Sequence, residues 1–110
     1  MSKEINQIAP GQRWVSDTES ELGLGLVMEV EGRRATVLFP AGNETRVYVK
    51  SAAPLTRVRF SVGELIESSE GWKMETLSIK EEDGLLIYSG LKEDGNKAEL
   101  SESELSSFIQ

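Results

Sequence analysis

An internal repeat constrains the fold of this chain more than any other feature of its sequence. Residues 51–58 follow one pattern: a serine, any three residues, a leucine, a hydroxyl residue, any residue and an apolar residue. Residues 101–108 follow the same pattern 50 positions later. Two more pairs of segments match in the same order: residues 11–16 with 63–68, and residues 37–39 with 86–88. Three matches in one order predict two similar units, one in each half of the chain.

Within each half, apolar residues alternate with polar residues in short runs, which is the pattern of half-buried β-strands. Ala35, Val37 and Phe39 share one face of such a run, and Val47 and Val49 share a face of the next. Turn residues that tolerate a positive φ separate the runs, at residues 31–32, 41–43, 83–84 and 94–96. This spacing favours small antiparallel barrels.

The order of elements in each unit is strand, long loop, three strands, a short helical turn and a last strand. That plan is typical of an SH3-like or Tudor-like barrel. We therefore predict an all-β fold of two tandem five-stranded small barrels, residues 1–56 and residues 57–110. A barrel this small buries a modest core, so the two should pack on each other with residues 53–60 as the joint.

Two local patterns add detail to the structure predicted for the second unit. Trp72 and Met74 lie on one face of their run whereas Leu77 and Ile79 lie on the other, which predicts a β-bulge near residues 75–76. Further along the chain, Ser101 and Glu104 have the spacing of a capping box, which suits the expected helical turn.

The composition excludes several kinds of chemistry. The 110 residues include no cysteine and no histidine, so thiol chemistry, the commonest general base and the commonest metal ligand are missing. Residues 23–25, Gly-Leu-Gly, lack the third glycine of a nucleotide loop, and we interpret them as a close backbone approach. The carboxylates Asp17, Glu19 and Glu21 fit a solvated loop better than an acid–base pair or a cation site. We predict no catalytic, cofactor-binding or metal-binding residue.

No apolar run approaches the length of a membrane-spanning helix, and the first residues lack the apolar stretch of a signal peptide. We expect a cytoplasmic protein with no membrane partner. The net charge of −7 disfavours nucleic acid as the main partner, because phosphate binding needs a basic surface. The balance is +1 over residues 1–60 and −8 over residues 61–110, so the halves can face different partners.

Candidate partner-binding residues occur in both halves. In the first, Arg33 and Arg34 lie at a predicted hairpin, and Arg46 and Lys50 flank Tyr48 on what we expect to be an outward strand face. A solvated strand face explains this pattern, and so does a basic-aromatic contact patch, since Arg and Tyr dominate interface hot spots.

In the second half, Glu81, Glu82 and Asp83 are expected at an exposed hairpin tip. Trp14 and Trp72 lie in apolar segments and are predicted to be structural. One outward tyrosine does not form an aromatic cage, which argues against recognition of methylated ammonium groups.

The sequence also resembles a known family. Residues 10–25 are similar to the opening of the RapA (HepA) family, bacterial RNA-polymerase-associated ATPases of the Swi/Snf helicase-like class. The likeness continues over residues 38–40, 45–48, 51–60, 71–74 and 82–86. The resemblance implies two tandem Tudor-like barrels, similar also to the KOW barrels of transcription elongation factors, at the amino terminus of a longer chain.

The resemblance further implies what such a region does. In that family an ATP-dependent, helicase-like enzyme recycles RNA polymerase, and its amino-terminal region contributes to polymerase contact and restrains the ATPase. None of the family's catalytic motifs lies in these 110 residues, so the expected function is a non-catalytic interaction module. Its partners would be RNA polymerase, which places it at the nucleoid, and the ATPase lobes of its own full-length chain. The alternative is a KOW-type module that contacts RNA or DNA weakly.

Together with the charge asymmetry, the resemblance implies a division of labour between the halves. The basic-aromatic face of the first unit would suit an acidic polymerase surface. The acidic tip of the second unit would suit the basic nucleic-acid cleft of the attached ATPase.

Overall fold

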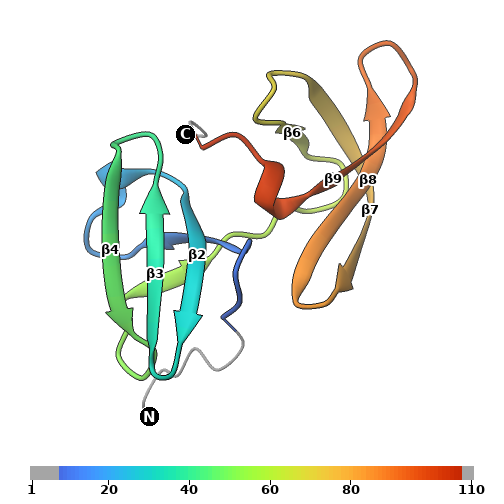
Figure 1. Cartoon of the computed structure of the whole chain (residues 1–110). Coiled ribbons are helices and arrows are strands. Elements are labelled where there is room, and N and C mark those ends of the chain that lie inside the picture. The colour runs from blue at the N-terminus through green and yellow to red at the C-terminus, as the bar shows by residue number, and fades with distance from the viewer. Residues whose placement is uncertain (1–7, 108–110) are drawn as a thin grey trace.

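The computed structural model describes residues 8–107, which form two curled antiparallel sheets placed side by side (Figure 1). The first sheet has the order β4-β3-β2-β1-β5, with β1 (Arg13–Ser16), β2 (Gly25–Glu31), β3 (Arg34–Phe39), β4 (Glu44–Val49) and β5 (Leu55–Arg57). The second has the order β6-β7-β8-β9, with β6 (Leu65–Glu67), β7 (Lys73–Glu82), β8 (Leu85–Lys92) and β9 (Lys97–Ser101). Two 3-10 turns, η1 (Ser20–Leu22) and η2 (Glu102–Glu104), complete the described elements. The predicted all-β fold of two tandem barrel-like units is confirmed.

The second unit differs from the first in its last strand. Up to residue 107, the chain after η2 forms an isolated bridge between Ser68 and Leu105 and no fifth paired strand. The amide of Ser106 donates to the carbonyl of Glu67 at 2.9 Å, and the carbonyl of Leu105 accepts from the side chain of Arg13. This segment therefore contacts both the end of β6 and the first unit. Phe108, the last residue of the sequence repeat, lies outside the described residues.

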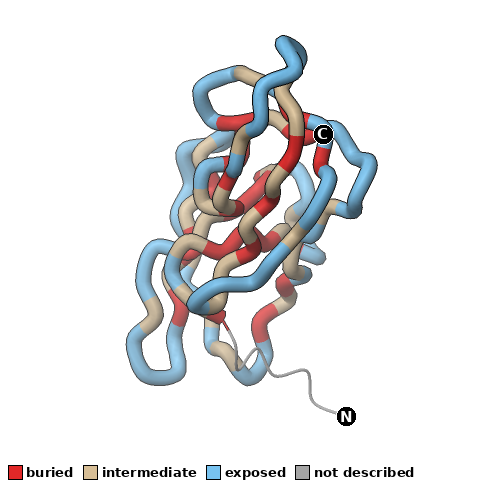
Figure 2. The backbone as a smooth tube through the Cα atoms, turned by 90° about the vertical axis from the view of Figure 1, so that its right-hand side faces the viewer, coloured by how far each residue is buried: buried red, intermediate tan, exposed pale blue. Residues whose placement is uncertain are grey.

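Each sheet closes over its own apolar core, seen as buried segments in Figure 2. The predicted inward face of β3 is confirmed, because Ala35, Val37 and Phe39 are at most 1% exposed. The first core also contains Trp14, Val27 and Leu55, and the second is built from Leu24, Ile66, Met74, Leu86, Tyr88, Leu100 and Leu105. Leu24 belongs to the first half of the sequence but packs in the second core, so the units share apolar contacts.

A β-bulge bends β7, as its broken alternation predicts. The register with β8 shifts between Thr76 and Ser78, and Leu77 is left half exposed. Opposite the bulge stands Gly90, where an added Cβ would lie 1.8 Å from the carbonyl oxygen of Glu75. Only glycine fits this close approach of the two backbones. Gly25 has a similar role in β2, because a Cβ there would lie 2.9 Å from the carbonyl oxygen of Trp14.

Candidate partner-binding surfaces

The cations Arg33, Arg34 and Lys50 meet at one end of the first sheet. The tight turn between β2 and β3 presents Arg33, and the amide of Lys50 donates to its carbonyl at 2.8 Å. Arg34 pairs with Val49 across the ladder and lines a shallow hollow. Two carboxylates, Glu29 and Glu31, share that hollow with Thr36 and Val47. The result is a small cationic end with acidic neighbours, and the side chains of Arg33 and Arg34 are exposed.

Arg46 is already paired within the chain. Its guanidinium lies 3.4 Å from a carboxylate oxygen of Glu19 and 3.0 Å from one of Glu44. Hydrogen bonds to these two carboxylates raise the pKa of Arg46, that to Glu19 most. Glu19, expected in a solvated loop, thus connects the loop after β1 to strand β4. The guanidinium of Arg46 is therefore less available to the carboxylates of a partner.

Tyr48 faces the core side of its strand, so the prediction that it points outward is wrong. It lies directly opposite Ala35, which is 1% exposed, and it packs against the first core. Residues directly opposite in an antiparallel pair share a face, and the tyrosine ring covers the small alanine. Burial raises the pKa of Tyr48. The outward positions are those of Val47 and Val49, 60% and 49% exposed, so the predicted basic-aromatic face does not form.

The acidic residues Glu81, Glu82 and Asp83 are exposed at the β7–β8 turn. Asp83 and Gly84 both have positive φ values, 53° and 83°, as the Asp-Gly pair predicts. Lys80 lies 3.4 Å from a carboxylate oxygen of Glu82, an exposed pair of the kind that contributes about 0–1 kcal/mol. The three carboxylates therefore remain accessible to a partner.

The backbone beneath this turn, however, is docked on the first unit. The carbonyl of Gly84 accepts hydrogen bonds from Nε2 of Gln12 at 2.8 Å and from Nη2 of Arg57 at 3.0 Å. The acidic turn is thus a fixed corner of the junction between the units rather than a free hairpin tip.

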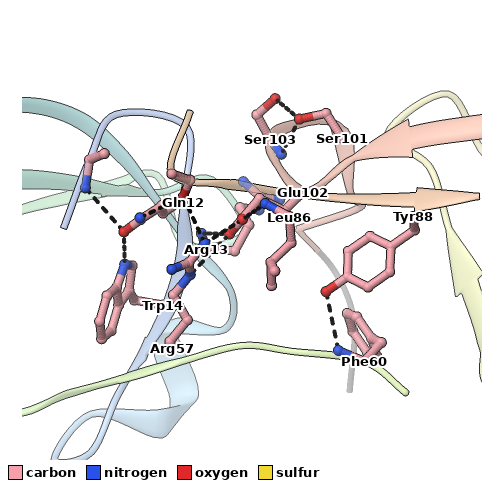
Figure 3. Close-up of polar contacts among 12 residues, drawn as sticks. Gln12, Arg13, Trp14, Arg57, Phe60, Leu86, Tyr88, Ser101, Glu102 and Ser103 are labelled. Carbon is pink, nitrogen blue, oxygen red and sulfur yellow. Dashed lines mark hydrogen bonds and ion pairs between the residues drawn. The ribbon is translucent and has the colours of Figure 1, made fainter. Parts of the chain in front are cut away.

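At the centre of that junction lies Glu102, which the sequence analysis did not single out (Figure 3). Its carboxylate is fully buried and accepts from the backbone amide of Arg13 at 2.9 Å and from Nη2 of Arg57 at 2.6 Å. The amide of Leu86 is a third donor to it. A single carboxylate thus joins β1, the end of β5 and β8. The predicted cap is formed by Ser101, which accepts from the amide of Ser103, whereas Glu104 is exposed.

Arg13 crosses the junction in the opposite direction. Its guanidinium Nη2 donates to the carbonyl of Leu105 at 2.6 Å and to the hydroxyl of Ser107 at 2.8 Å. Burial lowers the pKa of Arg13 to about 10, and the charge of Glu102 opposes that shift. With only 1% of its surface exposed, Arg13 is a structural link between the units and not a partner contact.

The two tryptophans differ in their surroundings. Trp14 is 8% exposed and its indole Nε1 donates to the side chain of Gln12 at 3.0 Å, as expected of a structural residue. Trp72 is only half-buried, with Nζ of Lys92 4.8 Å from its ring centroid and Glu70 accepting from its indole at 3.4 Å. Trp72 covers the edge of the second core and also forms part of the surface.

A further tyrosine secures the connection between the units. The hydroxyl of Tyr88 accepts from the amide of Phe60 at 3.2 Å, and the two rings meet edge to face with centroids 6.1 Å apart (Figure 3). Burial raises the pKa of Tyr88, which is fully enclosed in the second core. Phe60, at the end of the segment expected to join the units, is thus held against the second core.

Over residues 8–107 no cluster of three or more His, Cys, Asp or Glu side chains could hold a metal ion. The same part of the chain contains no helix long and apolar enough to cross a membrane. The buried carboxylate of Glu102 is surrounded by hydrogen-bond donors from the chain itself.

Two half-open barrels joined through buried polar contacts define a tandem Tudor-like module. Residues 8–58 match the family described as RapA N-terminal Tudor like domain 1, and residues 60–110 match the one described as RapA N-terminal Tudor like domain. The chain therefore belongs to the RapA family, as its amino-terminal Tudor-like region.

Individual relatives agree with this assignment. The chain is 53% identical over 104 residues to the RNA polymerase-associated protein RapA of Pseudomonas fluorescens (strain Pf0-1), covering 94% of the chain and 11% of that relative. It is 49% identical over 107 residues to the protein of the same name from Pseudomonas aeruginosa (strain LESB58), covering 97% and 11%. The chain thus spans about a tenth of the length of these relatives.

Proposed function

We propose that this chain is the non-catalytic docking and regulatory module of an RNA-polymerase-associated, ATP-dependent, helicase-like enzyme that recycles RNA polymerase. The observation that supports the proposal best is the match of both Tudor-like units to RapA, whose relatives are named RNA polymerase-associated proteins. Through polymerase the module would act at the nucleoid in the cytoplasm.

In this proposal the polymerase contact is the cationic end of the first unit. Arg33, Arg34 and Lys50 replace the wider basic-aromatic face, because Arg46 is paired and Tyr48 faces the core. An acidic polymerase surface would complement these three cations, and charges at the rim of an interface act mainly on the association rate.

Reversing two of these charges tests the polymerase contact. The double variant Arg33→Glu, Arg34→Glu is expected to bind purified core RNA polymerase about tenfold more weakly, mostly through slower association that depends on salt. Biolayer interferometry at two salt concentrations measures this. The matched control Lys73→Glu, Lys97→Glu reverses two exposed charges of the second unit and should keep wild-type affinity. If both variants lost the same affinity for polymerase, binding would depend on net charge and not on this contact.

Binding of single-stranded RNA to the same variants tests the alternative that the module contacts nucleic acid. If single-stranded RNA binds the wild-type chain with a steep salt dependence and the Arg33→Glu, Arg34→Glu variant loses that binding, the module is a nucleic-acid contact instead. The net charge of −7 leads us to expect no such binding.

The acidic turn is proposed to restrain the ATPase lobes by occupying their basic nucleic-acid cleft. In the full-length enzyme, Glu81→Gln, Glu82→Gln, Asp83→Asn should raise basal ATPase turnover several-fold, because a contact that favours the restrained state has been removed. Affinity for polymerase should stay unchanged. A triple control, Glu21→Gln, Glu29→Gln, Glu31→Gln, neutralises exposed carboxylates of the first unit and should leave basal turnover as it is. Unchanged turnover in the acidic-turn variant would refute the restraint.

A further inference from the structure

Within the described residues, strand β4 has a partner strand on one side only. It pairs with β3 on one side only and lies at the outer border of the first sheet (Figure 1). Among the other border strands of the described chain, β5 and β6 have three residues each, and β9 presents exposed Lys97 and Glu99. Short length and charge are the usual means of preventing edge-to-edge pairing. β4 has six residues and, after the exposed Glu44 at its start, also exposes Thr45, Val47 and Val49.

The free backbone groups of β4 can be assigned from its ladder with β3. The amide of Lys50 donates to the carbonyl of Arg33 at 2.8 Å, so the backbone at position 50 points toward β3. Backbone groups alternate in direction along an antiparallel strand. Those of Thr45, Val47 and Val49 therefore point away from β3, toward the open edge.

We propose that this edge pairs antiparallel with β4 of a second copy of the chain, around a two-fold axis at Val47. In this register Val47 faces its own counterpart as a hydrogen-bonded pair, and Thr45 faces Val49 in both directions. The outward amides of the three residues and the carbonyls of Thr45 and Val47 then have a partner strand opposite them. The carbonyl of Val49 also accepts from the amide of Ala52 at 3.1 Å within its own chain. Two five-stranded sheets would form one continuous sheet with an isologous interface.

Side-chain charges favour this register over its neighbours. It places Glu44 opposite Lys50 of the second copy, and Arg46 opposite Tyr48, with no like charges facing each other. If the axis were at position 46, Arg46 would lie opposite Arg46 of the second copy. If it were at position 48, Arg46 would lie opposite Lys50 of the second copy. Opposite charges across a strand pair stabilise it, whereas like charges directly opposite destabilise it. On the outer face the exposed valines would cover one another.

The chain lacks cysteine, so disulfide trapping gives a sharp test. Val47→Cys places a thiol on the proposed axis, where the two Cα atoms of a hydrogen-bonded pair would be about 5.5 Å apart, within disulfide range. We expect it to form a covalent dimer under mild oxidation. Val49→Cys is the matched control, because its counterpart is Thr45 and it should stay monomeric. Mixed Thr45→Cys and Val49→Cys chains should cross-link. Equal cross-linking of Val47→Cys and Val49→Cys, or none of Val47→Cys, would overturn the proposal.

Sedimentation equilibrium over a concentration series tests the charge pairing without a covalent trap. Glu44→Lys and Lys50→Glu should each weaken self-association at least several-fold, and the double swap should restore it. Val47→Lys should abolish self-association, whereas Val62→Lys, at an exposed valine of the second unit, should not. The proposed interface is contradicted if the chain stays monomeric at every concentration. It is also contradicted if the double-swap variant unfolds at the wild-type temperature but does not regain self-association.

Discussion

Replacing Glu102 by alanine is expected to lower the free energy of unfolding by about 3–5 kcal/mol, the cost of breaking a buried charge pair by removing one partner. The loss leaves Arg57, beside Trp14, with the carbonyl of Gly84 but without its carboxylate partner. It also leaves the amides of Arg13 and Leu86 without their acceptor. Both units depend on this carboxylate, so the effect should reach the whole molecule.

Urea unfolding followed by tryptophan fluorescence and by circular dichroism measures this change. The matched control is Glu104→Ala in the same turn, where the side chain is exposed and the expected change is within about 0.5 kcal/mol. Glu102→Gln should be intermediate in its cost, because the amide keeps one acceptor oxygen but loses the charge that Arg57 binds. If Glu102→Ala and Glu104→Ala unfold at the same urea concentration, the carboxylate does not hold the units together.

The probes also show whether the two units separate. In the wild type the junction should make unfolding a single cooperative transition, with both probes coinciding. Loss of Glu102 removes contacts between units while each apolar core stays intact. Divergence of the two probes in the variant would identify the junction as the source of cooperativity.

The core and the turns could be predicted from the sequence because they depend on local alternation. Ala35, Val37 and Phe39 keep a period of two, and Asp83 and Gly84 specify their turn without help from distant residues. The bulge in β7 likewise follows from a break in alternation along one strand.

The orientation of β4 could not be predicted in the same way. Val47 and Val49 alternate with Arg46 and Tyr48, so either face can be chosen as the buried one, and hydrophobicity favours the wrong choice. The register decides the face, since a shift by one residue turns every side chain over. That register is set by pairing with β3, where Tyr48 meets Ala35. For this reason the prediction that Tyr48 points outward was wrong.

The junction was missed because its partners are distant in sequence. Glu102 lies 45 residues from Arg57 and 89 from Arg13. The acidic segment around Glu102 gives no sign that one carboxylate is buried and Glu104 is exposed. Arg13 looks like any polar residue of a half-buried strand, and only the return of the chain after β9 encloses it. Buried charges of this kind follow from tertiary packing rather than from local pattern.

Replacing Trp14 by alanine is expected to cost about 3–5 kcal/mol of stability, as for other large buried aromatic residues. Trp14 is 8% exposed, and its loss would open a cavity in the core that also contains Val27 and Leu55. The substitution also removes a donor from the side chain of Gln12, which at the same time donates to Gly84 across the junction.

Trp72→Ala is the matched comparison for the Trp14 prediction. The half-buried indole of Trp72 has Lys92 on one face and packs only against the border of the second core. We expect its loss to cost less than about 2 kcal/mol, within the common range for point substitutions. Thermal and urea unfolding of the two variants compare the costs directly. Equal destabilisation would mean that Trp72 is as much a core residue as Trp14. A stable Trp72→Ala variant that binds polymerase more weakly would instead place Trp72 in the contact surface.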